Sequence, residues 1–137
     1  MAEFIMKYLV KQAGISEQFA ISSAATTTEE LGNDIYPNAK AELKQRGIPF
    51  EKRRACQIRS DEYNDWDLII AMDKENLADI EYFFGPDLEH KVRLLMSFAG
   101  EEKSVSDPWY TRNFTKAYDD IYRGCEGLLR SLLDERE

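Results

Sequence analysis

The sequence of 137 residues is poor in histidine and cysteine, and this scarcity excludes several kinds of site. It contains one histidine, His90, and two cysteines, Cys56 and Cys125. Two cysteines so far apart cannot form the disulfide scaffold of a small secreted domain. One histidine cannot build a histidine-rich metal site, and the acidic residues do not stand at metal-ligand spacing from it. We therefore expect no metal and no other cofactor.

Long apolar runs and an excess of basic residues are also missing. A transmembrane helix needs about 20 consecutive apolar residues, so no membrane partner is expected. The first residues, Met1–Phe4, lack the basic stretch of a secretory signal, and a cytoplasmic location is the default. Lys and Arg number 18 against 26 Asp and Glu, giving a formal net charge of -8. Because nucleic-acid binding needs clustered Lys and Arg, we expect no nucleic-acid partner.

One local basic run does occur, Lys52-Arg53-Arg54, with Arg59 nearby. It has two interpretations. The first is a solvated loop, as surface charge usually is. The second is a local positive field that attracts an anionic substrate to an otherwise acidic protein.

Length and hydrophobic spacing predict one α/β domain over residues 1–137. Helical spacing is found in four segments, residues 2–13, 37–47, 73–84 and 114–132. Strands are predicted at the alternating segment Phe19–Ala24 and at the apolar runs Leu68–Met72 and Lys91–Met96. Ser60 is expected to cap a short helix, Asp61–Asn64, and Asp73 to cap the helix that follows it. Strands that alternate with helices favour a parallel sheet. No strand precedes the first helix, so we expect that the sequence begins one strand late for such a fold.

The segment Val105-Ser106-Asp107-Pro108-Trp109-Tyr110 is the strongest chemical signal. A carboxylate held by a following proline, beside two aromatic rings, is typical of a general acid next to an aryl-binding wall. The alternatives are an ordinary Asp-Pro turn and a pair of half-buried aromatic residues.

Several segments, in order, resemble the low-molecular-weight protein tyrosine phosphatases along nearly the whole chain. They are Met1-Ala2-Glu3-Phe4, Ser22-Ser23-Ala24-Ala25-Thr26, Gly32-Asn33, Arg46-Gly47-Ile48-Pro49, Ala55-Cys56-Gln57-Ile58, Asp67–Asp73 with Asn76-Leu77, and Asp107-Pro108-Trp109-Tyr110. Each segment alone is weak, and together, at the spacing of the family, they are specific. The resemblance implies a three-layer α/β/α fold with a small parallel sheet and a phosphotyrosine protein or an aryl phosphate as the substrate.

The resemblance also implies roles for particular residues. Asp107 would protonate the leaving phenolate and then act as the base for the hydrolytic water, with Trp109 and Tyr110 flanking the aryl ring. Ser23 would support the phosphate-binding loop. Glu29 stands on the opposite wall, where many members carry an aromatic residue, and this difference bears on substrate choice. Arg53 stands where many members carry a loop-supporting histidine.

The family's nucleophile has no counterpart in the 137 residues. The resemblance implies a Cys-x5-Arg loop preceded by a strand, both before Met1, in which the thiolate attacks phosphorus. Six residues after Cys56 stands Glu62, and six after Cys125 stands Ser131. Cys125 lies on an apolar helical stripe and is expected to be a buried packing residue. Cys56 is either a plain loop residue or a thiol whose pKa is lowered by its basic neighbours.

We therefore expect an N-terminally truncated family member that is inactive as it stands. The alternative is a non-catalytic homologue that self-associates or binds aryl anions. A thiol-redox relative, similar to the arsenate reductases that share this fold, would need the same absent cysteine.

The implied strand would lie in the middle of the sheet, between Phe19–Ala24 and Leu68–Met72. Without it, two apolar strand edges would carry unpaired N–H and C=O groups. We therefore expect that the chain does not form the family's monomer unchanged. Either these two strands pair directly, or two chains share edges in an intertwined homodimer.

Overall fold

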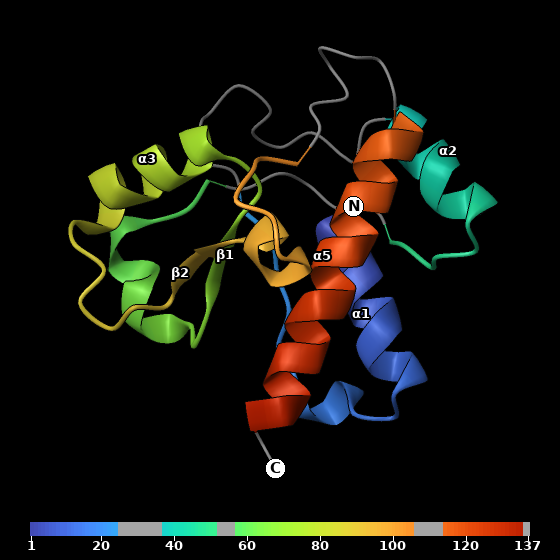
Figure 1. Ribbon diagram of the computed structural model, residues 1–137, viewed down its shortest axis with the longest axis horizontal. Coiled ribbons are helices and arrows are strands. Elements are labelled where there is room, and N and C mark those ends of the chain that lie inside the picture. Colours follow the sequence, from blue (N-terminus) through green and yellow to red (C-terminus); the bar gives the residue numbers. More distant parts are fainter. Residues whose placement is uncertain (25–36, 52–56, 106–113, 136–137) are drawn as a thin grey trace.

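The computed structural model describes residues 1–24, 37–51, 57–105 and 114–135. Figure 1 shows two long helices crossing beside a small sheet, with a third helix on the far side of that sheet. The elements, in chain order, are α1 (Ala2–Gln12), α2 (Pro37–Gln45), β1 (Ile69–Ala71), α3 (Lys74–Phe84), β2 (Val92–Leu94) and α5 (Phe114–Glu135). Three short 3-10 helices, η1 (Ser16–Gln18), η2 (Ser60–Asp65) and η3 (Leu95–Ala99), join them.

The two strands form a parallel pair, with α3 as the connection between them. Ile69 is opposite Val92 and Ala71 is opposite Leu94. A parallel pair needs such a crossover, because its strands run in the same direction. The α/β class is confirmed. The predicted strands at Leu68–Met72 and Lys91–Met96 are confirmed in their central residues. Beyond Leu94, the chain turns into η3 instead of extending the second strand.

The predicted strand at Phe19–Ala24 is wrong for the residues that the structure describes. No strand is assigned there, and among the described residues the sheet consists of β1 and β2 alone. The alternation still has structural meaning, because Phe19 and Ile21 pack against the main hydrophobic cluster. A strand needs a ladder partner as well as a buried face, and residues 19–24 do not pair with β1, which was one of the two arrangements that we expected. Sharing of edges between two chains stays a prediction.

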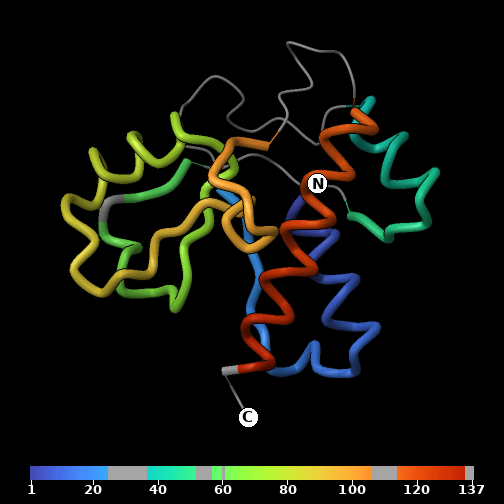
Figure 2. Tube along the Cα trace, viewed as in Figure 1, coloured from blue at the N-terminus to red at the C-terminus, as the bar shows by residue number. Residues whose placement is uncertain are grey.

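The main hydrophobic core lies between α1, α5 and η3. Ile5, Leu43, Leu95 and Met96 are fully buried, and Cys125 is 1% exposed, as expected for a packing residue on the apolar stripe of α5. The other side of the sheet has a much smaller core, made of Ile69, Ala71 and Ile80. The path of the chain in Figure 2 separates these two regions, with α3 and the strands on one side and α1 and α5 on the other.

Two glycines allow η3 to lie directly on α5. A Cβ atom at Gly127 would stand 1.9 Å from the carbonyl oxygen of Phe98, and one at Gly124 would stand 2.5 Å from Cγ of Leu95. Real Cβ atoms do not approach backbone this closely, so only glycine fits at position 127. This contact fixes where the chain leaves η3 toward residue 105.

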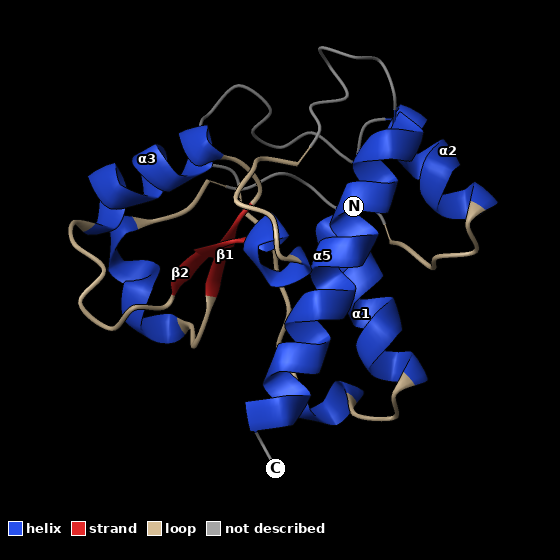
Figure 3. Ribbon diagram, in the orientation of Figure 1, coloured by secondary structure: helices blue, strands red, loops and turns tan. Residues whose placement is uncertain are grey.

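The helix ends predicted from the sequence are confirmed for α3 but not for the short helix near residue 61. Asp73 caps α3 as predicted, since its Oδ1 accepts a hydrogen bond from the Asn76 N–H at 2.7 Å. Gly85, at φ 71°, ends that helix. The short helix near residue 61 is a 3-10 helix whose N-cap is Arg59, not Ser60. Figure 3 shows how short these irregular helices and both strands are beside α1, α3 and α5.

A polar cluster holds the loop between α3 and β2. The Tyr63 hydroxyl donates to Asp87, which also accepts the backbone N–H groups of Lys91 at 3.0 Å and Val92 at 2.9 Å. The ammonium of Lys91 lies 4.1 Å from the centre of the Tyr63 ring. Hydrogen bonds to the ionised carboxylate outweigh its desolvation and lower the pKa of Asp87. This cluster fastens the start of β2 to η2.

Within the described residues, no helix is both long enough and apolar enough to span a membrane.

Candidate functional site

Ligands of open α/β sheets bind beyond the carboxyl ends of the strands, so the end of β1 is where a site is expected. The segment after η3 returns to this place. The Val105 N–H donates to the Met72 carbonyl at 2.8 Å, directly after β1. The Ser104 hydroxyl accepts the Lys74 N–H, at the start of α3, at 3.0 Å. These two bonds anchor residues 104–105 to the end of the strand and to the first turn of the next helix.

A chain of charges ties the same segment to α5. Arg123 Nη2 lies 2.9 Å from the buried Asp120, and Arg123 Nη1 lies 3.4 Å from Glu101. Lys103 contacts Glu101 at 3.4 Å. The hydrogen bond from Arg123 is the main cause of the lowered pKa of Glu101. Residues 101–105 are thus connected to the end of β1, to the start of α3 and to α5. These contacts hold the segment in place.

The start of α1 supplies a buried carboxylate to the same region. The Glu3 side chain is only 5% exposed and pairs with Lys7 at 2.9 Å. The Ser23 hydroxyl donates to Glu3 at 2.7 Å. A carboxylate in the first turn of a helix is also stabilised by the helix dipole. Ser23, predicted to support a phosphate-binding loop, is therefore held by α1 through Glu3.

The helices α2 and α5 are joined beside this region by another buried acid. Glu42 pairs with Arg46 at 3.1 Å and accepts a hydrogen bond from the Thr115 hydroxyl at 3.2 Å. The guanidinium of Arg46 lies over the Tyr118 ring, 4.7 Å from its centre. In Figure 1 the start of α5 and the loop after η3 reach the same upper end of the molecule. The described segments on both sides of residues 106–113 are thus fixed in place.

Most of the predicted site residues lie outside the described residues. Ser23 is described, whereas Asp107, Trp109 and Tyr110 fall in residues 106–113, Glu29 in residues 25–36, and Arg53 and Cys56 in residues 52–56. Their roles stay predictions. Arg59, at the edge of the basic run, is 69% exposed and pairs with Asp61 at 3.5 Å and Glu62 at 3.4 Å, which agrees with the solvated-loop interpretation for that residue.

Cys125 is unsuited to nucleophilic chemistry. Burial raises the pKa of its thiol to about 12, so the thiolate is scarce at neutral pH. Among the residues that the structure describes, no group of three or more His, Cys, Asp or Glu side chains could hold a metal ion.

Sequence reasoning missed Glu3, Ser104 and Arg123 as residues that organise this region. The sequence indicates little about Glu3, because the helix dipole makes acidic residues common in the first turn of any helix. Ser104 has none, since Lys74 stands 30 residues away along the chain. Arg123 has a local signal only for Asp120, three residues earlier on α5, and none for Glu101, which stands 22 residues away. Only the folded arrangement reveals such contacts.

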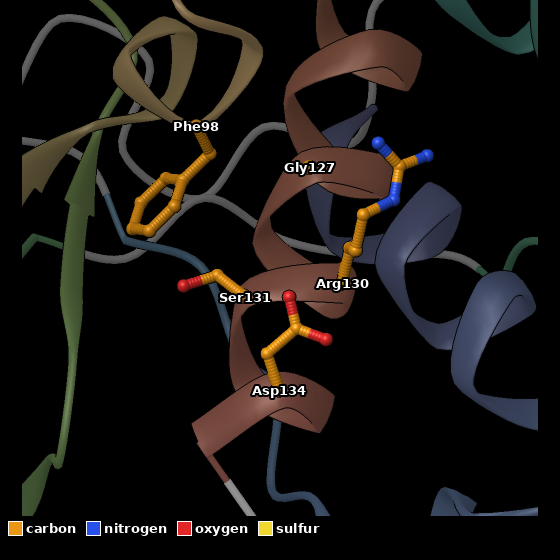
Figure 4. Close-up of a pocket in the computed structure, with 5 residues that line it drawn as sticks. All are labelled: Phe98, Gly127, Arg130, Ser131 and Asp134. Atoms are coloured by element: carbon orange, nitrogen blue, oxygen red, sulfur yellow. The ribbon is translucent and has the colours of Figure 1, made fainter.

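A pocket of about 430 Å³ occurs elsewhere, lined by Phe98, Gly127, Arg130, Ser131 and Asp134. Ser131 lies 17 residues beyond the start of α5, roughly 25 Å along the helix axis at 1.5 Å per residue. In Figure 4 the Phe98 ring and the Ser131 hydroxyl lie on one side of the helix, and the Arg130 guanidinium points to the other. Its polar groups do not converge, and we do not assign it to the site.

The chain matches a protein-family model over residues 1–137, that of the low molecular weight phosphotyrosine protein phosphatases. It is 30% identical over 139 residues to the low molecular weight protein-tyrosine-phosphatase YfkJ of Bacillus subtilis (strain 168), covering 100% of this chain and 89% of that one. It is 32% identical over 130 residues to PtpA of Staphylococcus aureus (strain bovine RF122 / ET3-1), covering 94% of this chain and 82% of that one.

Solved structures agree with the sequence relatives. The crystal structure of YfkJ from B. subtilis superimposes with a TM-score of 0.93 at 30% identity, covering 99% of this chain and 87% of that chain. The low molecular weight protein tyrosine phosphatase SP-PTP from Streptococcus pyogenes gives 0.84 at 32% identity, covering 96% and 82%. A drosophila arginine phosphatase, DARP, gives 0.85 at 27% identity, covering 96% and 87%.

Proposed function

Because the chain belongs to the low molecular weight phosphotyrosine protein phosphatase family, we propose that it carries the acid and aryl-binding half of a site for phosphate monoesters. Asp107 protonates the phenolate that leaves phosphorus and then takes a proton from the hydrolytic water. Trp109 and Tyr110 flank the aromatic ring of phosphotyrosine, and Glu29 stands on the opposite wall. Ser23 and Arg53 support the loop that binds the phosphate.

The observation that carries this proposal is the anchoring of residues 104–105. The Val105 N–H is bonded to the Met72 carbonyl at the carboxyl end of β1. Asp107 stands two residues after Val105 in the sequence, and this spacing supports a role for it at the carboxyl end of β1. A general acid delivered there is within reach of a substrate bound beyond the sheet.

We further propose that these 137 residues do not hydrolyse aryl phosphates by themselves. Phosphoryl transfer through a cysteine needs a thiolate stabilised by positive charge and donors for the transferring oxygens. No cysteine in the sequence is followed six residues later by arginine. The thiol pKa of Cys125, raised to about 12 by burial, supports the same conclusion.

A steady-state assay with an aryl phosphate tests both parts. The 137-residue chain is compared with a version extended at Met1 by an apolar strand and a Cys-x5-Arg loop. We expect no turnover by the first and turnover by the second. In the extended version, Asp107→Asn should lower the rate by about 10² to 10⁴, the usual contribution of general acid–base catalysis.

The matched control is Asp134→Asn, which removes a carboxylate at the far end of α5 and should leave the rate unchanged. Turnover by the 137-residue chain that disappears in Asp107→Asn would show that the site is already sufficient. An extended version without activity would contradict the assignment of the acid. Phosphoarginine is included as a second substrate, because one similar structure is an arginine phosphatase.

The second candidate is a non-catalytic homologue that retains aryl-anion binding. The sequence favours it because the segment Asp107–Tyr110 is present while the Cys-x5-Arg motif is not. Binding of a non-hydrolysable aryl phosphonate by the 137-residue chain, weakened in Trp109→Ala, would support this candidate. The cytoplasmic location, the single domain and the intertwined homodimer stay predictions of the sequence.

A further inference from the structure

We propose that the outer face of α3 is a docking surface for an arginine-bearing segment of another protein, whose guanidinium stacks on the Tyr82 ring beside carboxylates. We call this surface the Tyr82 face, made of Glu75, Ala78, Asp79, Glu81 and Tyr82. Tyr82 stands eight residues beyond Lys74, so it lies roughly 12 Å along the helix axis from the end that Ser104 anchors. The inference concerns a binding partner and goes beyond the proposed function.

The end of α3 presents large apolar side chains to solvent. Tyr82 is 86% exposed, and Leu88, in the loop after α3, is 79% exposed. The other exposed large apolar residue in the described part of the chain, Leu133, is only 38% exposed. Single exposed apolar residues are normal, whereas two that are this exposed and six positions apart indicate a contact surface. Tyrosine is also enriched among the residues that dominate binding energy at interfaces.

Helical spacing explains why Tyr82 faces outward. Leu77, Ile80 and Phe84 are spaced so that they share one side of α3, and they pack in the core over the sheet. At 3.6 residues per turn, Tyr82 lies on the opposite side from Ile80. Ala78, four residues earlier and also exposed, is its neighbour on that side and leaves room beside the ring. In Figure 1, α3 lies on the side of the sheet away from α1 and α5.

The Tyr82 ring is held in place by the next residue. The ring centres of Tyr82 and Phe83 are 5.7 Å apart and the ring planes cross at 82°, an edge-to-face pair. Phe83 is half-buried. A side chain that is already ordered loses less entropy when a partner packs on it. The negative face of such a ring attracts a cation.

The charge around Tyr82 determines which partner fits. From Glu75 to His90 the sequence has five acidic residues and no lysine or arginine. Glu75 and Glu81 are exposed and Asp79 is half-buried. This charge repels nucleic acid and the same face of a second copy, and it attracts a basic segment.

Other rings of this protein already hold a cation beside a neighbouring carboxylate. The guanidinium of Arg46 lies 4.7 Å from the centre of the Tyr118 ring and pairs with Asp119, the next residue, at 3.4 Å. The ammonium of Lys7 lies 5.5 Å from the centre of the Phe4 ring and pairs with the preceding acidic residue at 2.9 Å. An aromatic ring next to an acidic residue is thus a cation site in this fold.

Tyr82 has the ring and the acids without the cation. Glu81 precedes it, and Asp79 is three residues earlier on the helix. Among the described residues, no lysine or arginine lies over the Tyr82 ring. The missing cation therefore comes from a partner. Arginine suits the position better than lysine, because its planar guanidinium stacks on a ring and binds carboxylates through two N–H groups.

Peptide titration followed by NMR tests the proposal on the isotope-labelled 137-residue chain. The probe is a capped synthetic peptide with two arginines and one leucine among glycine and serine residues. The matched peptide has lysine in place of arginine. The arginine peptide should shift the amide signals of residues 78–83 saturably, and the lysine peptide should bind more weakly. Added salt should weaken both.

Four surface variants show which groups bind. Tyr82→Ala should weaken binding of the arginine peptide about fivefold, while Tyr82→Phe, which keeps the ring, should bind as the wild type does. Glu81→Gln should weaken binding about twofold. Leu133→Ala, on α5, is the control and should change nothing. Circular dichroism checks that each variant is folded.

Any of three results overturns the proposal. The first is the absence of a saturable shift in α3, and the second is equal binding by Tyr82→Ala. The third is equal binding of the lysine peptide, which would mean unspecific attraction to an acidic protein. A free chain that is dimeric by light scattering and becomes monomeric in Tyr82→Ala would also overturn it, since the occupant would then be a second copy. None of these measurements involves phosphate hydrolysis, so their failure leaves the proposed function standing.

Discussion

The helical region of the molecule and its sheet region are held together in different ways. The helical region, α1 with α5, α2 and η3, is a hydrophobic core centred on fully buried side chains such as Ile5 and Leu95. The sheet region, β1 and β2 with α3, has only Ile69, Ala71 and Ile80 as buried apolar residues. Polar groups compensate there, with Asp87 accepting three hydrogen bonds. Most of the buried apolar surface, and therefore most of the expected stability, lies in the helical region.

This difference matters because the candidate site lies where the two regions meet. Ser23 and Glu3 belong to the helical side, while Met72 and the anchored Ser104 belong to the sheet side. The site is therefore bounded by one side with a large hydrophobic core and one side with a small core.

The largest effect is expected from emptying the core of the helical region. Ile5→Ala removes a fully buried side chain and should lower the free energy of unfolding by about 3–5 kcal/mol. Ile80→Ala, in the smaller core, should cost about 2–3 kcal/mol. Urea unfolding followed by circular dichroism measures both. The exposed Leu88→Ala is the control, with a change below about 0.5 kcal/mol. An equal or larger loss for Ile80→Ala would contradict the ranking of the two regions.

The next effect concerns a close contact within the helical region, η3 against α5. Gly127→Ala places a methyl group against the backbone of Phe98 and should cost about 1–3 kcal/mol, despite the higher helix propensity of alanine. Gly124→Ala meets the side chain of Leu95, which can shift, so its loss should be smaller. Thermal unfolding of the two variants checks the order. The close packing of η3 on α5 is wrong if Gly127→Ala stabilises the protein.

A third change weakens the polar support of the sheet region. Asp87→Asn should lower the free energy of unfolding by about 1–2 kcal/mol at neutral pH, because the amide cannot accept the same set of hydrogen bonds. In the folded state, the hydrogen bonds that Asp87 accepts hold its pKa below the ordinary value of 3.8. Its contribution is therefore present above about pH 4 and is lost as the pH falls through the lowered pKa.

Unfolding measured between pH 6 and pH 2 tests this directly. The difference between the wild type and Asp87→Asn should shrink below about pH 4. A difference that stays constant to pH 2 would mean that the Asp87 carboxylate is not favoured in the folded state. Asp61→Asn, which changes an aspartate that is 76% exposed, is the matched control.

The smallest effect is expected at the anchor of the candidate site. Ser104→Ala removes the acceptor of the Lys74 N–H and should cost about 0.5–1.5 kcal/mol or less. The more specific readout is amide exchange, which should become faster at Lys74 and Val105 and stay unchanged in α1. Ser16→Ala, in the exposed turn η1, serves as the control. Unchanged exchange at both amides would show that Ser104 does not hold the segment.

The sequence predicts contacts that are local along the chain and misses those that join distant segments. Local patterns were sufficient for α1, α3, α5 and the Asp73 cap, because hydrophobic spacing and capping act within a few residues. The strand at Phe19–Ala24 was wrong, since its alternation predicts a buried face but cannot supply a ladder partner. Contacts such as Ser23 with Glu3 join distant parts of the chain and leave no periodic signal. The roles of Asp107 and Trp109 still rest on the sequence.

We propose that these 137 residues lack the nucleophile of the phosphatase reaction and retain its acid, Asp107. Intact-mass measurement after a rapid acid quench, during incubation with an aryl phosphate, tests it most directly. We expect that the 137-residue chain acquires no phosphoryl group, whereas the version extended by a strand and a Cys-x5-Arg loop acquires one. A phosphoryl group found on Cys56 or Cys125 of the 137-residue chain would contradict it.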